Sequence, residues 1–379
     1  MRGNMDNNLP NELVNKGRQV ELDLAKYLST LFMIFLHCLM VTSGFKNDIS
    51  IYLQRGIGQL LGGPFAAPVF MFLMGNGIVY SKNQDPIYLI KRGISMIFLG
   101  FVVNIGEFFL PNYLAGKLLG EWNIFPTAGG LLLFCVDILA FAGMAMILIG
   151  VLKKAGLSAW QMFFIAVGMS IVGSFLRFHD FGSAIPNLLA GYFIGSAGGF
   201  TAFPLFNWFI FPTAGVLLGE FYIRSDDPEA MLRFWPAGLA GSIAYFVTSW
   251  TRPEGFLSEI HHYYFMTTID AVFCLICIYG FIGLCYFVSM LLSDSAKAFI
   301  SKTSANVNTI YVLQWFLIPV TYILICYFKR DIVFGDLSLI IIAILEIAAC
   351  TEIAAGFKYI SKYIQNRKEG AKENDTKKG

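Results

Sequence analysis

The sequence predicts an all-α integral membrane protein with about ten transmembrane helices, on three observations. Of its 379 residues, 56% are hydrophobic and only 14% are charged, whereas a soluble domain has about 25% charged residues. Apolar segments of membrane-spanning length recur along the chain. The 37 phenylalanines and 37 glycines suit a lipid-facing surface and close contacts between helices.

Ten apolar segments have the length of a transmembrane helix. We place them at residues 22–42, 57–80, 88–110, 128–151, 159–177, 204–223, 235–251, 265–291, 307–328 and 337–361. A further apolar run, residues 183–200, is short and rich in glycine. We expect this run to be re-entrant or to span half of the bilayer, and an eleventh full crossing is the alternative.

The distribution of lysine and arginine predicts the orientation. With ten crossings and both termini in the cytoplasm, 19 of these residues fall on the inner side and 7 in outer loops. This asymmetry follows the positive-inside rule, whereas an eleventh crossing would place the basic end of the chain outside. We therefore expect a multi-pass cell-membrane protein with a cytoplasmic segment at residues 1–20, a transmembrane domain at 21–361 and a basic, disordered tail at 362–379.

Composition argues against several kinds of partner and cofactor. Because most basic residues are placed by topology, we expect membrane lipids as partners and no nucleic acid. All seven cysteines fall in apolar segments, where a free cysteine behaves as a small hydrophobic residue. We therefore expect no disulfide and no metal site. Cys274 and Cys277 form a CxxC pair, but they lie in an apolar helix without a second ligand pair.

The first apolar segment carries three polar groups that are costly in a membrane. Charged residues inside a spanning helix indicate function by default, and this segment holds Asp23, Lys26 and His37. At ~100° per residue, Lys26 and His37 share one face of the helix, and they lie roughly 16 Å apart along its axis. We expect Asp23 and Lys26 at the cytoplasmic end, paired with each other, and His37 in the outer half.

The second apolar segment contains two prolines within GQLLGGPFAAPVFMFLMGNG, Pro64 and Pro68. Proline removes a backbone hydrogen-bond donor and kinks a helix. Inside a membrane, a broken helix is tolerated only against other helices or beside a cavity. We therefore expect this segment to line a cavity.

Several of these motifs resemble membrane acyltransferases. LDLAKYLSTLFMIFLHC resembles their opening helix, which has an Asp, a basic residue three positions later and a His after ten intervening residues. PFAAPVFMFLMGNGI and LIKRGISMIFLGFVVNIG are similar to helices of the heparan-alpha-glucosaminide N-acetyltransferase-like group, as are VDILAFAGMA and FPLFNWFIFPTAGVLLGEF. SKTSANVNTIYVLQWFLI resembles a late helix of the acyltransferase-three family.

The chain departs from these families at three places. Lys26 stands where the family pattern has Arg, and lysine binds phosphate as a point charge rather than through a two-pronged contact. Gln314 stands where His often precedes the Trp. The resemblance to the eukaryotic heparan-modifying enzymes would imply a catalytic His in the loop after the first helix, but that loop, SGFKNDISIYLQRG, has none. Catalysis would therefore rest on His37.

The resemblance implies acyl transfer from cytoplasmic acyl-CoA, most simply acetyl-CoA, to a hydroxyl or amine at the outer face, often on a sugar or glycan. In that interpretation Lys26, assisted by Lys91 and Arg92, holds the CoA phosphates. Asp23 belongs to the same cofactor site as the partner of Lys26, and no metal takes part. His37 acts as general base or is itself acylated. The resemblance leaves open whether the acyl group is transferred to oxygen or to nitrogen. It also leaves open whether the protein forms a homo-oligomer.

Eight further residues are candidates for acceptor binding, and each also has a purely structural interpretation. They are Asn104, Glu107, Arg177, His179, Asp180, Trp208, Gln314 and Trp315. His37 itself has a structural alternative, a hydrogen bond to a neighbouring helix. His261 and His262 precede two tyrosines, a pattern typical of an interfacial aromatic belt.

Two other classes of protein fit parts of the sequence. A transporter or flippase of a lipid-linked or small polar solute would also need broken helices and charge inside the membrane. It is disfavoured because no inverted repeat is evident. A structural or sensory membrane protein is disfavoured because little of the chain lies outside the bilayer.

Overall fold

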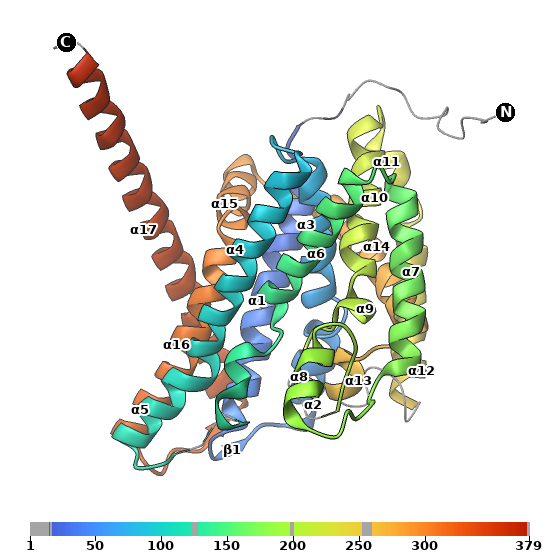
Figure 1. The fold of residues 1–379 in the computed structure, drawn as a ribbon. Coiled ribbons are helices and arrows are strands. Elements are labelled where there is room, and N and C mark those ends of the chain that lie inside the picture. Colours follow the sequence, from blue (N-terminus) through green and yellow to red (C-terminus); the bar gives the residue numbers. More distant parts are fainter. Residues whose placement is uncertain are drawn as a thin grey trace.

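A computed structural model of the chain describes residues 15, 17–122, 124, 128–197, 201–251 and 260–376. It is a bundle of helices, most of which run along one common axis (Figure 1). In the described part of the chain, the regular strands are β1 (Asn47–Asp48) and β2 (Phe334–Gly335), which pair in parallel. The strong apolar composition therefore forms helices, as predicted.

The first half of the chain contributes α1 (Val20–Thr42), α2 (Ile51–Arg55), α3 (Ala67–Val79), α4 (Pro86–Asn104), α5 (Leu110–Leu118), α6 (Ile138–Lys154), α7 (Ala159–Leu176) and α8 (Ala184–Gly191). Two π-helices, η1 (Gly56–Leu61) and η2 (Ile105–Phe109), and a 3-10 helix, η3 (Ala128–Phe134), lie among them. The second half contributes α9 (Leu205–Trp208), α10 (Ile210–Arg224), α11 (Pro228–Met231), α12 (Trp235–Thr251), α13 (Ile260–Tyr264), α14 (Thr268–Leu291), α15 (Asp294–Ser304), α16 (Val307–Phe328) and α17 (Asp336–Thr376).

Six helical stretches among the described residues are long and apolar enough to cross a membrane. They are Val20–Thr42, Pro86–Leu118, Ala159–Leu176, Thr268–Leu291, Val307–Phe328 and Asp336–Ser361. A polytopic helical membrane protein is therefore supported. The other four predicted segments hold shorter helices, α3, α6, α10 and α12, of 13, 17, 15 and 17 residues. Ten crossings stay a prediction.

The glycine-rich run 183–200 contains one short helix in its described part. This helix, α8, has eight residues and is therefore about 12 Å long at ~1.5 Å per residue. A bilayer core is ~30 Å thick, so α8 is too short to cross it. The helix lies near one end of the bundle (Figure 1), as a half-spanning segment would.

Different elements lie at the two ends of the helix bundle. α1 begins and α17 ends at the upper end in Figure 1, where α11 and α15 also lie. β1, α5, α8 and α13 lie at the opposite, lower end. The last turn of α6, with Lys153 and Lys154, and the first turns of α4, with Lys91 and Arg92, are at the upper end. This is the end predicted to be cytoplasmic.

α3 packs closely against α10 at two glycines, Gly75 of α3 and Gly215 of α10. A Cβ atom added at Gly75 would lie 1.9 Å from the carbonyl oxygen of Pro212, and one added at Gly215 would lie 1.8 Å from that of Phe72. Small residues let helix backbones approach this closely. The reciprocal contact fixes α3 between α10 and α1, which α3 also contacts. α3 is thereby held in the wall of the cavities described next.

Candidate active site

α1 lines two cavities, one near each end of the helix, and the broken second segment lines both with it. The upper cavity has a volume of about 170 Å³ and is lined by Asp23 and Lys26 of α1 and by Asn76 and Tyr80 at the end of α3. The second, which we call the His37 cavity, has a volume of about 50 Å³. The prediction that the proline-containing segment lines a cavity is thus confirmed.

The His37 cavity brings together polar groups that are far apart in the sequence. Its polar lining is His37 of α1, Glu107 of η2, Asp137 beside α6, and Tyr311 and Trp315 of α16. Its remaining lining is mostly apolar or aromatic. Because one water needs roughly 10–15 Å³ by this measure, the cavity has room for a few waters or for a small acyl group.

A chain of hydrogen bonds links three of these side chains. The indole Nε1 of Trp315 donates to the hydroxyl of Tyr311 over 3.0 Å, and that hydroxyl donates to Oδ1 of Asp137 over 2.7 Å. Tyr311 and Trp315 are four residues apart and so share one face of α16. Asp137 is the N-cap residue of α6. The chain therefore fixes the Asp137 carboxyl group at the cavity wall.

His37 lies against the same aromatic group. Its ring centroid is 4.1 Å from that of Trp315 and 5.9 Å from that of Tyr311. Gln314 lies beside the imidazole, although neither atom of its amide has a hydrogen bond of normal geometry to a described residue. His37 is 7% exposed. Three of the candidate residues, His37, Gln314 and Trp315, therefore lie next to one another in the structure.

Two polar atoms of this cavity have no partner among the described residues, Nδ1 of His37 and Oδ2 of Asp137. Both side chains are more than nine-tenths buried. A buried polar atom without a hydrogen bond costs about 1–3 kcal/mol, so such atoms are uncommon away from functional sites. Together they offer a proton acceptor and a hydrogen-bond acceptor to a ligand in the cavity.

Glu107 reaches the cavity from a π-helix, and π-helical turns inside α-helices occur frequently at functional sites. Its carboxyl group is close enough to that of Asp137 for the two to interact electrostatically. Asp137 was not among the predicted site residues. The signal for it in the sequence is an Asp directly before the apolar run of VDILAFAGMA, where helix N-caps are common.

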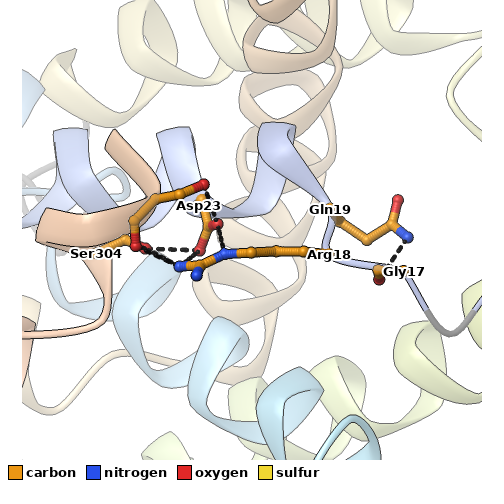
Figure 2. A network of polar contacts seen from close by, with 6 residues as sticks. Gly17, Arg18, Gln19, Asp23 and Ser304 are labelled. Atoms are coloured by element: carbon orange, nitrogen blue, oxygen red, sulfur yellow. Dashed lines mark hydrogen bonds and ion pairs between the residues drawn. The ribbon is translucent and has the colours of Figure 1, made fainter. Parts of the chain in front are cut away.

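The polar network at the start of α1 corrects one prediction. Asp23 pairs with Arg18 rather than with Lys26 (Figure 2). Its carboxylate also accepts hydrogen bonds from the hydroxyls of Ser301, over 2.9 Å, and Ser304, over 2.6 Å. Asp23 and Lys26 are three residues apart and so project about 60° apart around the helix. Asp23 therefore meets α15, and the extended segment before α1 brings Arg18 to the same place.

The predicted basic cluster is only partly assembled. Lys26 is half-buried and lines the upper cavity, and it interacts electrostatically with Asp23 and Arg92. Arg92 is half-buried, whereas Lys91 is exposed. Lys26 and Arg18 are therefore the basic residues in the lining of this cavity, and neither Lys91 nor Arg92 is part of that lining.

The predicted acceptor residues Arg177, His179 and Asp180 follow α7 and lie outside the lining of the His37 cavity. His179 and Asp180 are exposed, whereas Arg177 is half-buried. Asp180 accepts hydrogen bonds from the side chain of Asn187, over 2.8 Å, and from the backbone N–H of Gly182, over 2.9 Å. These bonds hold the pKa of the Asp180 carboxyl below its usual value. The loop after α7 is therefore held by a contact with α8 and by one within the loop itself.

Asn104 and Trp208 lie behind the cavity wall rather than in it. The Asn104 amide donates to the carbonyl oxygens of Leu133 and Cys135, over 2.9 Å each, and so fixes the segment that leads to Asp137. Trp208 is fully buried and donates to the carbonyl oxygen of Tyr264 over 2.7 Å. Both residues support the site, and neither is open to a ligand here.

The remaining predictions concern histidines and metal ligands. His262 packs edge-on against Phe178, and the side chain of His261 lies outside the described residues. All seven cysteines are free and buried. Within the described ranges, no three His, Cys, Asp or Glu side chains are grouped as metal ligands would be.

Comparison with known proteins gives one match. The family model described as heparan-alpha-glucosaminide N-acetyltransferase, catalytic, matches residues 18–252. These residues run from the start of α1 to the end of α12 and include His37, Glu107 and Asp137, whereas Tyr311 and Trp315 follow the matched range. No curated protein and no solved structure gives a match.

Proposed function

The chain belongs to the heparan-alpha-glucosaminide N-acetyltransferase catalytic family, and from that premise we propose a reaction and a site for it. The protein moves an acetyl group from cytoplasmic acetyl-CoA to a hydroxyl or amine of a sugar or glycan at the opposite membrane face. The His37 cavity is the place of transfer. One observation supports this most strongly: Nδ1 of His37 and Oδ2 of Asp137, both buried and unpaired among the described residues, line the same small cavity.

The donor approaches from the upper end of the bundle, which is the end predicted to face the cytoplasm. Lys26, with Arg18 and Arg92 nearby, binds the phosphates of CoA at the upper cavity as charge-assisted contacts. The thin arm of CoA then follows α1 toward His37, which lies roughly 16 Å farther along the helix. α3 flanks this course, because its residues line both cavities.

In the transfer step, the acceptor oxygen or nitrogen attacks the carbonyl carbon of the thioester. Nδ1 of His37 takes the proton from the acceptor as the new bond forms. The carbon–sulfur bond then breaks, and the CoA sulfur leaves as a thiolate that takes the proton back from His37. Asp137 accepts a hydrogen bond from the acceptor and is itself held by Tyr311.

The acceptor approaches from the lower end. Of the candidate residues, Glu107 and Trp315 line the cavity, and Gln314 lies next to His37; we assign these three to the acceptor or to its orientation. His179 and Asp180 are exposed and Arg177 is half-buried; all three lie outside the cavity lining and would contact only the distal part of a larger glycan. Asn104 and Trp208 act indirectly, by fixing the wall.

Transfer of labelled acetyl groups by purified protein tests this proposal. Wild-type protein is incubated with [14C]acetyl-CoA and a panel of amino sugars and neutral sugars, beside the His37→Ala variant. Since general base catalysis contributes roughly 10²- to 10⁴-fold, we expect the variant to lose that factor in kcat while it still binds acetyl-CoA. If the wild-type protein neither binds nor turns over acetyl-CoA, its assignment as an acetyltransferase is refuted. Solute uptake that persists in His37→Ala would favour a transporter.

The alternative in which His37 is itself acylated gives a different result in the same assay. Without an acceptor, a covalent route leaves label on the protein that survives denaturation, in an amount up to one acetyl group per chain. Direct transfer leaves none. Peptide mass spectrometry of α1 separates the two routes.

A further inference from the structure

The upper cavity holds two buried hydrogen-bond donors that the binding of phosphate does not explain. Nδ2 of Asn76 and the hydroxyl of Tyr80 have no partner within the described part of the chain. Asn76 is 3% exposed, and both side chains line the cavity. Burying a donor without a partner is costly, so the pair indicates a ligand that supplies hydrogen-bond acceptors.

The local sequence places both donors on one side of the broken segment. Asn76 and Tyr80 are four residues apart and so project in nearly the same direction at the end of α3. Gly219 of α10 leaves space for the Asn76 amide, because a Cβ atom there would lie 3.2 Å from Nδ2. Lys26 faces the same cavity from α1. The cavity is thus rich in donors, with one charged donor and two neutral ones.

We propose that Asn76 and Tyr80 bind amide carbonyl oxygens in the arm of the acyl-CoA donor, between its phosphates and its thioester. This inference rests on the proposed function. Two features support it. Neutral donors match a carbonyl oxygen, whereas Lys26 matches a phosphate. The α3 helix then runs from Asn76 to Ala67 in the His37 cavity, about 14 Å at ~1.5 Å per residue, which is the direction in which the arm must travel.

Three thioester donors test separately the contacts to the phosphates and the contacts to the amides of the acyl-CoA arm. Acetyl-CoA carries the phosphates and the amides, acetyl-pantetheine carries the amides without the nucleotide phosphates, and S-acetyl-2-mercaptoethanol carries neither. In Asn76→Leu we expect kcat/KM to fall by about 3- to 10-fold for the first two donors, the worth of one hydrogen bond, and to stay unchanged for the third. In Lys26→Met we expect a fall for acetyl-CoA alone.

A matched pair of tyrosine variants provides the control. Tyr80 and Tyr222 both have a buried hydroxyl without a partner among the described residues, but only Tyr80 is in the lining of the upper cavity. Tyr80→Phe should lower kcat/KM for acetyl-pantetheine by several-fold, whereas Tyr222→Phe should leave it at the wild-type value. Equal effects of the two variants would overturn the assignment of Tyr80.

The outcomes for Asn76 are distinct from those for the function itself. Size-exclusion chromatography and thermal unfolding first establish that each variant is folded, and Asn76→Ser replaces Asn76→Leu where it is not. Wild-type activity with acetyl-pantetheine and an unchanged kcat/KM in the Asn76 variant overturns this inference alone. A wild-type protein that turns over none of the three donors overturns the proposed function.

Discussion

At the scale of single residues, the site is defined by polar atoms that the protein leaves unpaired in an apolar interior. His37 and Asp137 line the same cavity, and each has one such atom. By contrast, Asp23 is saturated with contacts from Arg18, Ser301 and Ser304. Saturation indicates a structural role, because such a carboxylate has little left to offer a ligand. The difference separates Asp137 from Asp23 although both are acidic groups in a membrane protein.

The Asp137→Asn variant tests the assignment of Asp137 to the acceptor. The amide oxygen of the variant would still accept the Tyr311 hydrogen bond, but its amide nitrogen cannot accept one from the acceptor. A hydrogen bond to a charged group is worth about 1.5–3 kcal/mol, so we expect kcat/KM for the acceptor to fall roughly 10- to 150-fold, with KM for acetyl-CoA unchanged. Steady-state kinetics with each substrate varied in turn measures this. Asp226→Asn, at an exposed position between α10 and α11, is the control, and an unchanged kcat/KM in the Asp137 variant would contradict the assignment.

At the scale of helices, some features follow from local sequence and others only from packing. The face shared by Lys26 and His37 follows from spacing within one helix, and the structure places these two residues at separate cavities along α1. The approach of Glu107, Asp137 and Tyr311 to His37 depends on how four separate segments pack, which spacing along the chain does not encode. The partner of Asp23 was predicted wrongly for the same reason, since Arg18 precedes the helix.

The contact between α3 and α10 predicts a large difference between two neighbouring glycines. A Cβ atom at Gly75 would lie 1.9 Å from a backbone oxygen, whereas one at Gly77 has no heavy atom within 4 Å. Gly75→Ala should therefore destabilise the protein by at least about 1–3 kcal/mol through overpacking. Gly77→Ala should be neutral or stabilise it by up to about 1 kcal/mol, since alanine favours a helix. Thermal unfolding in detergent compares them, and equal melting temperatures would argue against this packing of α3.

At the scale of the whole molecule, the proposed reaction depends on direction. α1 begins and α17 ends at the upper end (Figure 1), which requires an even number of crossings if both helices span. The positive-inside rule predicts that this end faces the cytoplasm. In the proposed reaction, the upper cavity would then face the compartment that supplies acetyl-CoA, and the His37 cavity would lie deeper, toward the opposite face.

Labelling of single introduced cysteines tests this orientation. All seven native cysteines are buried, so they should contribute little background. Both substituted positions are exposed: Lys82 lies between α3 and α4, and Lys46 directly precedes β1, which lies at the lower end in Figure 1. In intact cells, a membrane-impermeant maleimide should label Lys46→Cys but reach Lys82→Cys only after the cells are opened. The reverse pattern would show that the upper end faces away from the cytoplasm, which would exclude binding of a cytoplasmic donor at the upper cavity.

A structure of the protein with a non-transferable acetyl-CoA analogue, in which a thioether replaces the thioester, tests the proposed donor site most directly. We expect the phosphates beside Lys26, the arm amides at Asn76 and Tyr80, and the acyl end in the His37 cavity, within van der Waals reach of the imidazole. An analogue bound elsewhere, or bound with its acyl end away from His37, would contradict this proposal.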